Sequence, residues 1–334
     1  MAINAYAAKK KGAQLEPYAY EPGALGNDDV EVRITHCGIC HSDVHLIDND
    51  WGLSSYPLVP GHEIVGTVSA RGSSVKNLKV GQRVGIGWLA GTCMNCEWCK
   101  EGSENLCSMW QPTCVGRPGG FADTVRADSR WTFAIPDDLP SAEAAPLLCA
   151  GITVFTPLMD YGAGKGSRVG VVSVGGLGHL AVQFARTMGA EVTAFSTSRS
   201  KRDETRKFGA QKFVQLDNAE EMASAANSQD LILTTASADL PWDALVASLR
   251  PRGVLCVLGI PQNQVSIGAF PLLAGHKKVV GSNTGNRKMM EKMLKFAAQH
   301  KIFPTIQRYP MTRVNEAIDT LRDKSVRYRA VLEA

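Results

Sequence analysis

The chain lacks the sequence features of membrane, secreted and nucleic-acid-binding proteins. No apolar run approaches the roughly 20 residues that span a bilayer. The lysines near Met1 are followed by no apolar segment, as a secretory signal would require. No basic run is interleaved with aromatic residues. We therefore expect a cytoplasmic protein with neither a membrane nor a nucleic-acid partner.

Strong charge is also absent, since charged residues make up 20% of 334 residues and the net charge is only +4. Hydrophobic residues make up 44%, which is typical of a soluble globular chain. A chain of this length can bury two substantial cores. The slight positive charge favours an anionic cofactor without indicating nucleic acid.

Nine cysteines without an export signal favour reduced thiols and metal over disulfides. Four of them follow the spacing C-x2-C-x2-C-x7-C, namely Cys93, Cys96, Cys99 and Cys107. Four thiolates so close in sequence can close a tetrahedron around a structural zinc ion. An iron–sulfur cluster is the alternative, because ferredoxins use similar spacing. Cys37, Cys114 and Cys256 lie outside these patterns and are interpreted as ordinary buried cysteines.

A second set of metal-binding residue types begins in 38–45, Gly-Ile-Cys-His-Ser-Asp-Val-His, and ends in 60–63, Pro-Gly-His-Glu. Cys40 and His62 are too far apart for one local finger but suit two ligands that a fold brings together. Cys149 is the candidate third ligand. Three protein ligands leave a position open for water or substrate, as in catalytic zinc sites. The alternative is a core cysteine and a hydrogen-bonded histidine.

Hydrophobic periodicity divides the chain into two kinds of structure. The first 130 residues read as short β-strands, with the 38–63 residues in loops between them. A helix with a Ser141 capping start is expected to continue through Cys149 toward Met159. From residue 168 strands alternate with helices, and the glycine-rich turn 173–178 lies between a buried strand and a helix. The alternative is such a turn in an unrelated α/β domain. Helices are expected at 287–300 and 314–322, and a closing strand at 328–332.

Together these residues resemble the zinc-dependent medium-chain alcohol dehydrogenases, most of all their cinnamyl alcohol dehydrogenase branch with its bacterial aldehyde reductases. The residues that carry this resemblance lie in segments 38–45 and 60–63, the four-cysteine loop, Leu148 to Thr153 and the glycine-rich turn. The resemblance covers almost the whole chain. It implies an α/β protein with a GroES-like β-barrel catalytic domain, 1–149 completed by 286–334. A Rossmann doubly wound parallel-sheet domain, 150–285, would bind NADP(H).

The resemblance also implies roles for individual residues. Catalytic zinc falls on Cys40, His62 and Cys149, with Glu63 as an occasional ligand, and a second, structural zinc on the four-cysteine loop. Asp43 should orient His62, and Ser42, His45 and Asp50 match the proton relay. Trp51 and Trp88 fall near the substrate pocket. The implied cofactor contacts are His41, Thr153, Ser173, Val174, Gly175, Gly176, Leu177, Gly178, Ser196, Thr197, Ser198, Arg199, Lys201, Thr235, Gly259, Ser282, Asn283 and Thr284. Ser173 stands where the family usually has glycine.

The residues at the end of the second strand of the dinucleotide-binding domain predict whether NAD or NADP is bound. NAD-binding domains carry an acidic residue about 20 residues past the glycine-rich turn, which accepts from the ribose 2′-hydroxyl. Here the segment reads Ser-Thr-Ser-Arg-Ser-Lys-Arg from residue 196, and no carboxylate occurs before Asp203. Hydroxyls and cations at this place suit the extra phosphate of NADP.

These observations favour an NADP-dependent zinc alcohol dehydrogenase that mainly reduces aromatic or medium-chain aldehydes. A polyol dehydrogenase on the same scaffold is the alternative enzyme, although Trp51 and Trp88 argue against a sugar-like pocket. A non-catalytic zinc- and nucleotide-binding redox sensor is the alternative from another class. We expect a homo-oligomer, with a dimer favoured.

Overall fold

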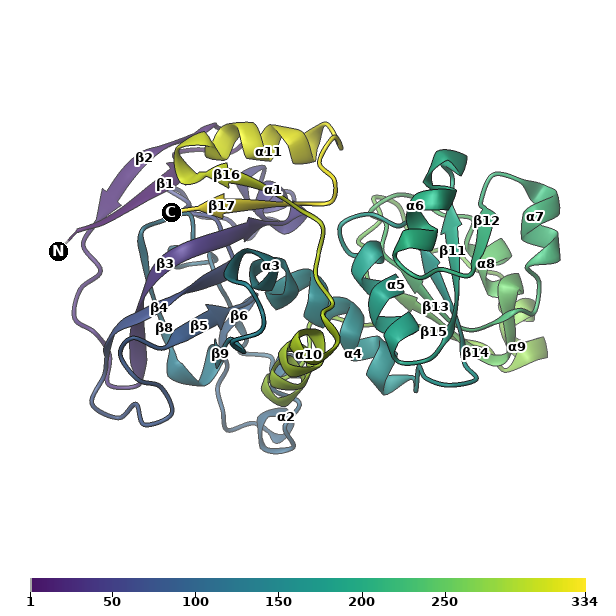
Figure 1. Ribbon diagram of the computed structural model, residues 1–334, viewed down its shortest axis with the longest axis horizontal. Coiled ribbons are helices and arrows are strands. Elements are labelled where there is room, and N and C mark those ends of the chain that lie inside the picture. Colours follow the sequence, from purple (N-terminus) through teal and green to yellow (C-terminus); the bar gives the residue numbers. More distant parts are fainter. Residues whose placement is uncertain (1) are drawn as a thin grey trace. The chain divides into compact units, whose positions relative to one another are not determined.

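The computed structural model describes residues 2–334, which form two compact units (Figure 1). The first unit holds Met1–Ile152 and Thr284–Ala334, and the second holds Thr153–Asn283. The chain therefore leaves the first unit once and returns to it, and each unit is built around its own sheet.

The first unit is built on a seven-stranded sheet in the order β16-β17-β3-β4-β5-β9, with β8 paired to β3. Along β3 (Asp29–Ile39), Val30, Val32 and Ile34 alternate inward, as one-sided burial of a strand requires. The other strands of this sheet are β4 (Glu63–Arg71), β5 (Arg83–Ile86), β8 (Thr124–Asp128), β9 (Thr132–Ala134), β16 (Ile306–Pro310) and β17 (Arg329–Glu333). Two small pairs complete the unit, β1 (Ile3–Ala8) with β2 (Leu15–Tyr20) and β6 (Leu89–Gly91) with β7 (Gln111–Pro112).

The expectation that residues 38–63 lie only in loops is wrong, because His41–Ile47 forms the helix α1. The helix is too short to show a hydrophobic period, and its start depends on Asp43, whose carboxylate accepts from the backbone N–H of Cys40. Further helices of this unit are α2 (Glu97–Lys100), α10 (Arg287–His300) and α11 (Val314–Arg322). The last two have the bounds predicted from the sequence.

The segment Ser141–Asp160 corrects two expectations. It is long and apolar enough to cross a membrane, but 83% of it is buried inside the protein, as in the core helix of a soluble protein. Its N-cap residue is Pro140, which makes no side-chain capping bond, and Ser141 is the first helical residue, with a hydroxyl that accepts from Arg83. The segment consists of α3 (Ser141–Pro146), a π-helical turn (Leu147–Gly151) and α4 (Ile152–Asp160). Such π turns are frequent at functional sites, and this one carries Cys149.

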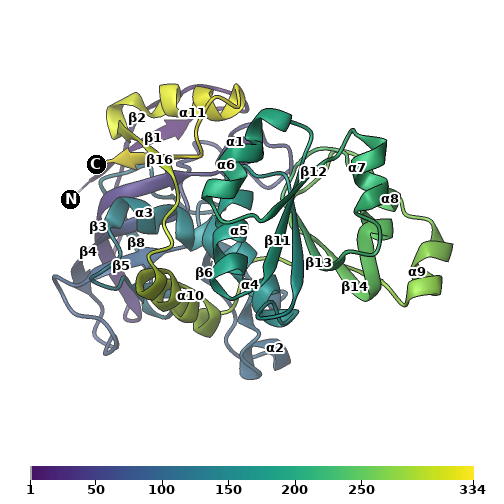
Figure 2. The same ribbon diagram turned by 45° about the vertical axis from the view of Figure 1, so that its right-hand side comes forward.

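The second unit is a parallel sheet in the order β12-β11-β10-β13-β14-β15, the order of dinucleotide-binding folds. Its strands are β10 (Arg168–Val172), β11 (Glu191–Ser196), β12 (Lys212–Gln215), β13 (Gln229–Thr234), β14 (Leu249–Val257) and β15 (Lys278–Gly281). Figure 2 shows helices on both faces; they are α5 (Gly178–Thr187), α6 (Arg202–Lys207), α7 (Ala219–Ser224), α8 (Trp242–Ser248) and α9 (Ala269–Gly275). Val172, Phe195, Ile232 and Leu255 share one buried cluster.

Candidate metal centres and active site

A single buried carboxylate, that of Asp43 in α1, connects the two predicted segments 38–45 and 60–63. Its Oδ2 accepts from the N–H of Cys40 at 2.9 Å. Its Oδ1 accepts from the N–H of Gly61 and from Nδ1 of His62, each at 2.9 Å. With Nδ1 donating, the lone pair of His62 lies on Nε2, the nitrogen that faces Cys149. Asp43 thus orients His62 in the way that metal-binding histidines are held.

Four predicted ligands converge around that nitrogen. One ligand atom each from Cys40, His62, Glu63 and Cys149 lies within 4.8 Å of the others, and all four residues are buried. The Cys149 Sγ lies 3.3 Å from His62 Nε2, although the two residues are 87 positions apart. Two thiols, an imidazole and a carboxylate are the donor types that zinc prefers.

The protonation of this cluster favours a cation in its centre. A hydrogen bond from Cys149 holds the pKa of Cys40 well below its usual value, whereas the pKa of Cys149 is raised well above it. Burial lowers the pKa of His62, but the carboxylate of Asp43 outweighs it and raises that pKa well above its usual value. The thiol pKa values are thus shifted in opposite directions at a place where a divalent cation would bind both sulfurs.

Glu63 has one oxygen paired and one free. Its Oε1 accepts from Nη2 of Arg329, whereas Oε2 is buried without a hydrogen-bond partner among residues 2–334. Burial raises the pKa of Glu63 to about 7, although Arg329 opposes the rise. A Cβ at Gly38 would lie 2.0 Å from Oε2, so only glycine fits beside it. An unpaired buried carboxylate oxygen suits an occasional metal ligand.

Two residues of this centre were missed by the sequence analysis. Arg329 lies on β17, 266 residues after Glu63, and its only sequence signal is a charge on an otherwise apolar strand. Cys114 was interpreted as an ordinary core cysteine. Instead, its sulfur lies within 4.8 Å of ligand atoms of Asp43 and His62. No spacing rule connects it to them.

The three predicted relay residues lie on or beside α1. The Ser42 hydroxyl lies 3.7 Å from the sulfur of Cys40. His45 Nδ1 lies 2.7 Å from Oδ2 of Asp50, and both side chains are partly exposed. Within residues 2–334 no hydrogen bond joins Ser42 directly to His45. Ser42 and the His45–Asp50 pair are therefore separate parts of the predicted relay.

Tryptophans form a wall against the metal cluster. The ring of Trp88 meets the ring of His62 edge-on, with centroids 5.0 Å apart. Trp51 lies 6.3 Å from Trp88 and 5.1 Å from His45. The ring of Trp110, which the sequence analysis did not single out, lies 6.3 Å from that of Trp88. Both predicted substrate residues therefore belong to one apolar surface next to the ligands.

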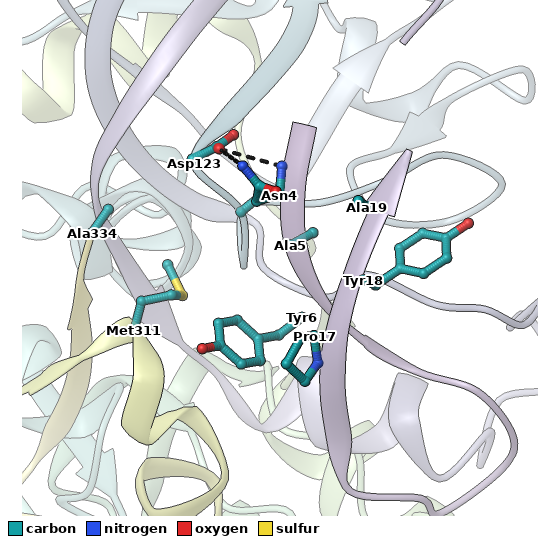
Figure 3. A pocket seen from close by; sticks show the side chains of 10 residues that line it. Asn4, Ala5, Tyr6, Pro17, Tyr18, Ala19, Asp123, Met311 and Ala334 are labelled. Atoms are coloured by element: carbon teal, nitrogen blue, oxygen red, sulfur yellow. Dashed lines mark hydrogen bonds between the residues drawn. The ribbon is translucent and has the colours of Figure 1, made fainter. Parts of the chain in front are cut away.

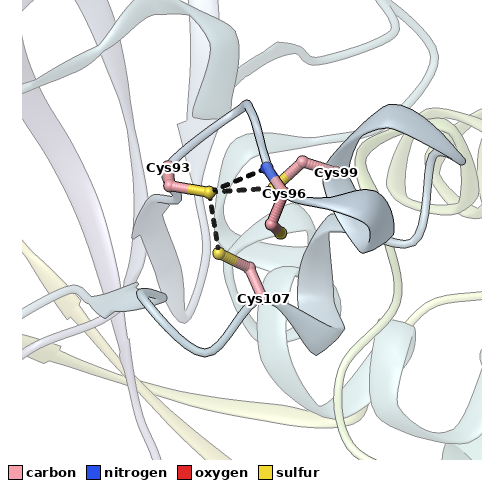
Figure 4. A group of neighbouring side chains, drawn as sticks. All are labelled: Cys93, Cys96, Cys99 and Cys107. Carbon is pink, nitrogen blue, oxygen red and sulfur yellow. Dashed lines mark hydrogen bonds between the residues drawn. The ribbon is translucent and has the colours of Figure 1, made fainter.

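The four-cysteine loop gathers its sulfurs at tetrahedral spacing (Figure 4). The Cys93 sulfur lies 3.5 Å from that of Cys107 and 3.9 Å from that of Cys99. Zinc–sulfur bonds of about 2.3 Å place the sulfurs of a tetrahedron about 3.8 Å apart. The N–H groups of Asn95 and Cys96 lower the pKa of Cys93 to about 6, which favours its thiolate. The residues fit one zinc ion, whereas an iron–sulfur cluster would hold the thiolates farther apart.

The glycine-rich turn of the second unit connects β10 to α5. Ser173 adopts a left-handed φ of 70°, which glycine adopts most easily. Its carbonyl accepts from the Thr235 hydroxyl at 2.6 Å, and a Cβ at Gly178 would lie 2.1 Å from that oxygen. A Cβ at Gly175 would meet nothing within 4 Å. The turn is therefore closely packed against the sheet at Gly178 and open at Gly175.

The end of β11 lies next to that turn. Ser196 is buried, and its hydroxyl accepts from the N–H of Ser198 at 3.1 Å. The Lys201 ammonium donates to the carbonyl of Val174 at 3.2 Å, so it reaches the glycine-rich turn. Thr197 and Arg199 are exposed. A Cβ at Gly259 would lie 2.0 Å from the Ala236 carbonyl.

The remaining predicted cofactor residues lie at the start of α1 and at the chain junctions. His41 is the first residue of α1. Thr153 opens the second unit, Ser282 and Asn283 close it, and Thr284 begins the return to the first unit.

A cavity of about 430 Å³ lies elsewhere in the first unit, beside β1 and β2 (Figure 3). Tyr6, Tyr18 and Met311 line it, and the Asp123 carboxylate there accepts from Asn4. It contains none of the predicted ligands or relay residues, so we assign the chemistry to the metal cluster and not to this cavity.

Known proteins share this architecture over the whole chain. Residues 26–137 match the alcohol dehydrogenase GroES-like domain, and residues 176–299 match the zinc-binding dehydrogenase family. Aldehyde reductase AdhA of a Synechocystis strain is 42% identical over 99% of this chain and 98% of its own. The chain belongs to the zinc-dependent medium-chain alcohol dehydrogenases, in their cinnamyl alcohol dehydrogenase-like branch.

Two further relatives of this dehydrogenase differ in their named activity. A mannitol dehydrogenase of Petroselinum crispum is 42% identical over 96% of this chain and 97% of its own. The crystal structure of a cinnamyl alcohol dehydrogenase from Helicobacter pylori, complexed with NADP(H), superposes with a TM-score of 0.92 at 30% identity, over 100% of this chain and 98% of that one. The predicted fold class and the prediction of a zinc-dependent alcohol or aldehyde oxidoreductase are confirmed.

Asp43→Asn should weaken zinc binding at the Cys40 cluster about 10- to 100-fold, the usual effect of removing the partner of a metal-binding histidine. An asparagine amide cannot accept all three hydrogen bonds that Asp43 accepts. Competition with a chromophoric chelator measures the affinity. Asp50→Asn, in the same region but away from the ligands, is the matched control and should bind zinc as wild type does. An unchanged affinity in Asp43→Asn would show that the carboxylate does not organise the site.

Proposed function

We propose that the chain transfers hydride between NADP(H) and a primary alcohol or its aldehyde, and mainly reduces aromatic or medium-chain aldehydes. The observation that carries this proposal is the buried set of Cys40, His62 and Cys149 beside a tryptophan wall. We assign the catalytic zinc to these three ligands and the structural zinc to the four cysteines. We further assign 1–149 with 286–334 to the GroES-like catalytic domain, and 150–285 to the Rossmann NADP-binding domain.

Zinc in the three-residue site would act as a Lewis acid on an alcohol or carbonyl oxygen, and the nicotinamide would give or take the hydride. Ser42, next to the Cys40 ligand, holds and moves the hydroxyl proton of the substrate. His45, held by Asp50 and partly open to solvent, is the outlet for that proton, because imidazole titrates near neutrality. Glu63, with its unpaired Oε2, is an occasional ligand.

The substrate class follows from the walls of the site. Trp51, Trp88 and Trp110 offer flat apolar faces and edges, which bind aromatic rings well. A polyol would need hydrogen-bond partners for each hydroxyl, and the indoles offer few. The mannitol dehydrogenase relative makes the polyol alternative worth testing. A panel of cinnamaldehyde, benzaldehyde, hexanal and mannitol distinguishes the two, and turnover of mannitol alone would select the alternative.

The preference for NADP(H) rests on Ser196 at the end of β11 and on the neighbouring cations. Ser196 places no carboxylate against a 2′-phosphate, and Arg199 or Lys201 can supply its counter-charge. The Helicobacter pylori relative, solved with NADP(H), supports the same choice.

We infer a cytoplasmic homodimer that forms through the second unit. Its last strand, β15, is an edge of the sheet, and the neighbouring α9 buries none of its residues within the chain. Phe270 and Leu273 on α9 are 78% and 72% exposed. A second copy can pair with the same edge about a twofold axis and cover these side chains. Light scattering that gives the mass of a single chain would contradict the dimer.

Ser42→Ala should lower NADPH-dependent turnover of cinnamaldehyde about 10²-fold or more while both zinc ions remain, because it removes a positioned proton-transfer group. Absorbance at 340 nm measures it. Ser42 lies inside α1, whose cap is Cys40, so little stability should be lost. The exposed Ser55 provides the control, since Ser55→Ala should turn over as wild type does. Full turnover in Ser42→Ala would remove this residue from the relay.

Ser196→Asp should reverse or erase the preference for NADPH over NADH, because a carboxylate there repels the 2′-phosphate and accepts from a free 2′-hydroxyl. The measurement is kcat/KM with each cofactor. Ser224→Asp on α7 adds the same charge to the same unit and should keep the preference. A wild-type protein that favours NADH would overturn the assignment.

A further inference from the structure

The four-cysteine loop holds the segment by which the chain returns to the first unit. Glu104 lies in this loop and is only 3% exposed. Its Oε1 accepts from Nε and Nη2 of Arg287, at 2.8 and 2.7 Å. The next residue, Asn105, donates from Nδ2 to the carbonyl of Thr284 at 2.9 Å. Two neighbouring side chains of the loop therefore fix both ends of the segment 284–287.

That segment is also the start of a well-anchored helix. Arg287 is the first residue of α10, and the Asn286 side chain caps the helix by accepting from the N–H of Met289 at 2.7 Å. A carboxylate at a helix N-terminus is favoured by the helix dipole. Met290 packs with Thr284 and Trp88 around a space of only about 10 Å³. The return segment is thus held between the four-cysteine loop and the wall of the active site.

The segment 284–287 directly follows residues that are predicted to contact the cofactor. Thr284 directly follows Ser282 and Asn283, which are the last residues of the second unit. All three are predicted to contact the cofactor. We propose that Glu104 and Asn105 are positioning residues that hold 284–287 and thereby couple the four-cysteine zinc site to dinucleotide affinity. This inference rests on the proposed cofactor site.

A purely structural role would have a different signature. A buried ion pair that only stabilises the fold would lower the melting temperature of Glu104→Gln and leave cofactor affinity as it was. Positioning instead predicts a change in affinity with chemistry nearly intact, since neither residue is assigned contact with the substrate or the metal.

The experiment compares Glu104→Gln and Asn105→Ala with Glu101→Gln, an exposed residue of the same loop. Both test variants should keep two zinc ions by metal analysis and exchange amide hydrogens faster in peptides that cover 282–290. Their Kd for NADPH, from nicotinamide fluorescence, should rise about 5- to 30-fold, in the lower part of the range usual for coupled sites. At saturating NADPH their kcat should stay within about 2-fold of wild type. Glu101→Gln should match wild type throughout.

Unchanged NADPH affinity in both variants overturns the coupling, and so does faster exchange without a change in Kd. If Glu104→Gln loses a zinc ion, Asn105→Ala decides the matter, because it leaves the Glu104–Arg287 pair intact. A wild-type protein that binds neither NADPH nor NADH contradicts the proposed function as well as the coupling. If wild-type protein binds NADPH and the variants bind it equally well, only the coupling is contradicted.

Discussion

The active site depends on three hydrogen bonds to one buried carboxylate. Asp43 joins the start of α1 to the segment before β4, because it accepts from the backbone of Cys40 and Gly61 and from the ring of His62. A buried carboxylate is costly unless its oxygens are satisfied, and here each bond also fixes a metal-binding residue or the residue next to one. The same contacts that offset the burial of Asp43 therefore assemble the site.

The charges around Asp43 explain why a cation belongs there. Asp43, Glu63 and the thiols of Cys40 and Cys149 share one buried region, whose permanently charged cation among the described residues is Arg329. The pKa of Cys40 is lowered while those of Cys149 and Glu63 are raised, so the acids compete for ionisation. A bound divalent cation relieves this competition and lets the thiols ionise together.

The sequence could predict those parts of the molecule whose chemistry is local. Four cysteines in one loop define their own site, and long amphipathic helices such as α10 repeat their apolar residues often enough to fix their bounds. Arg329 and Cys114 could not be predicted, because only the tertiary fold brings them to the centre, Arg329 on a strand and Cys114 in a turn. Helix α1 was missed for a different reason: it is seven residues long, and its start depends on the local capping box of Cys40 and Asp43 more than on a hydrophobic period. Trp110 follows the four-cysteine loop, and its packing on Trp88 is likewise set by the fold.

The central claim is that the protein holds two zinc ions of different coordination, one open and one closed. Zinc K-edge X-ray absorption of the pure protein tests it most directly. Four sulfurs at one site and two at the other average to three sulfurs and one nitrogen or oxygen ligand per zinc. We expect two zinc ions per chain with that average. A single zinc ion with four sulfur ligands in an enzyme that still reduces aldehydes would contradict the account.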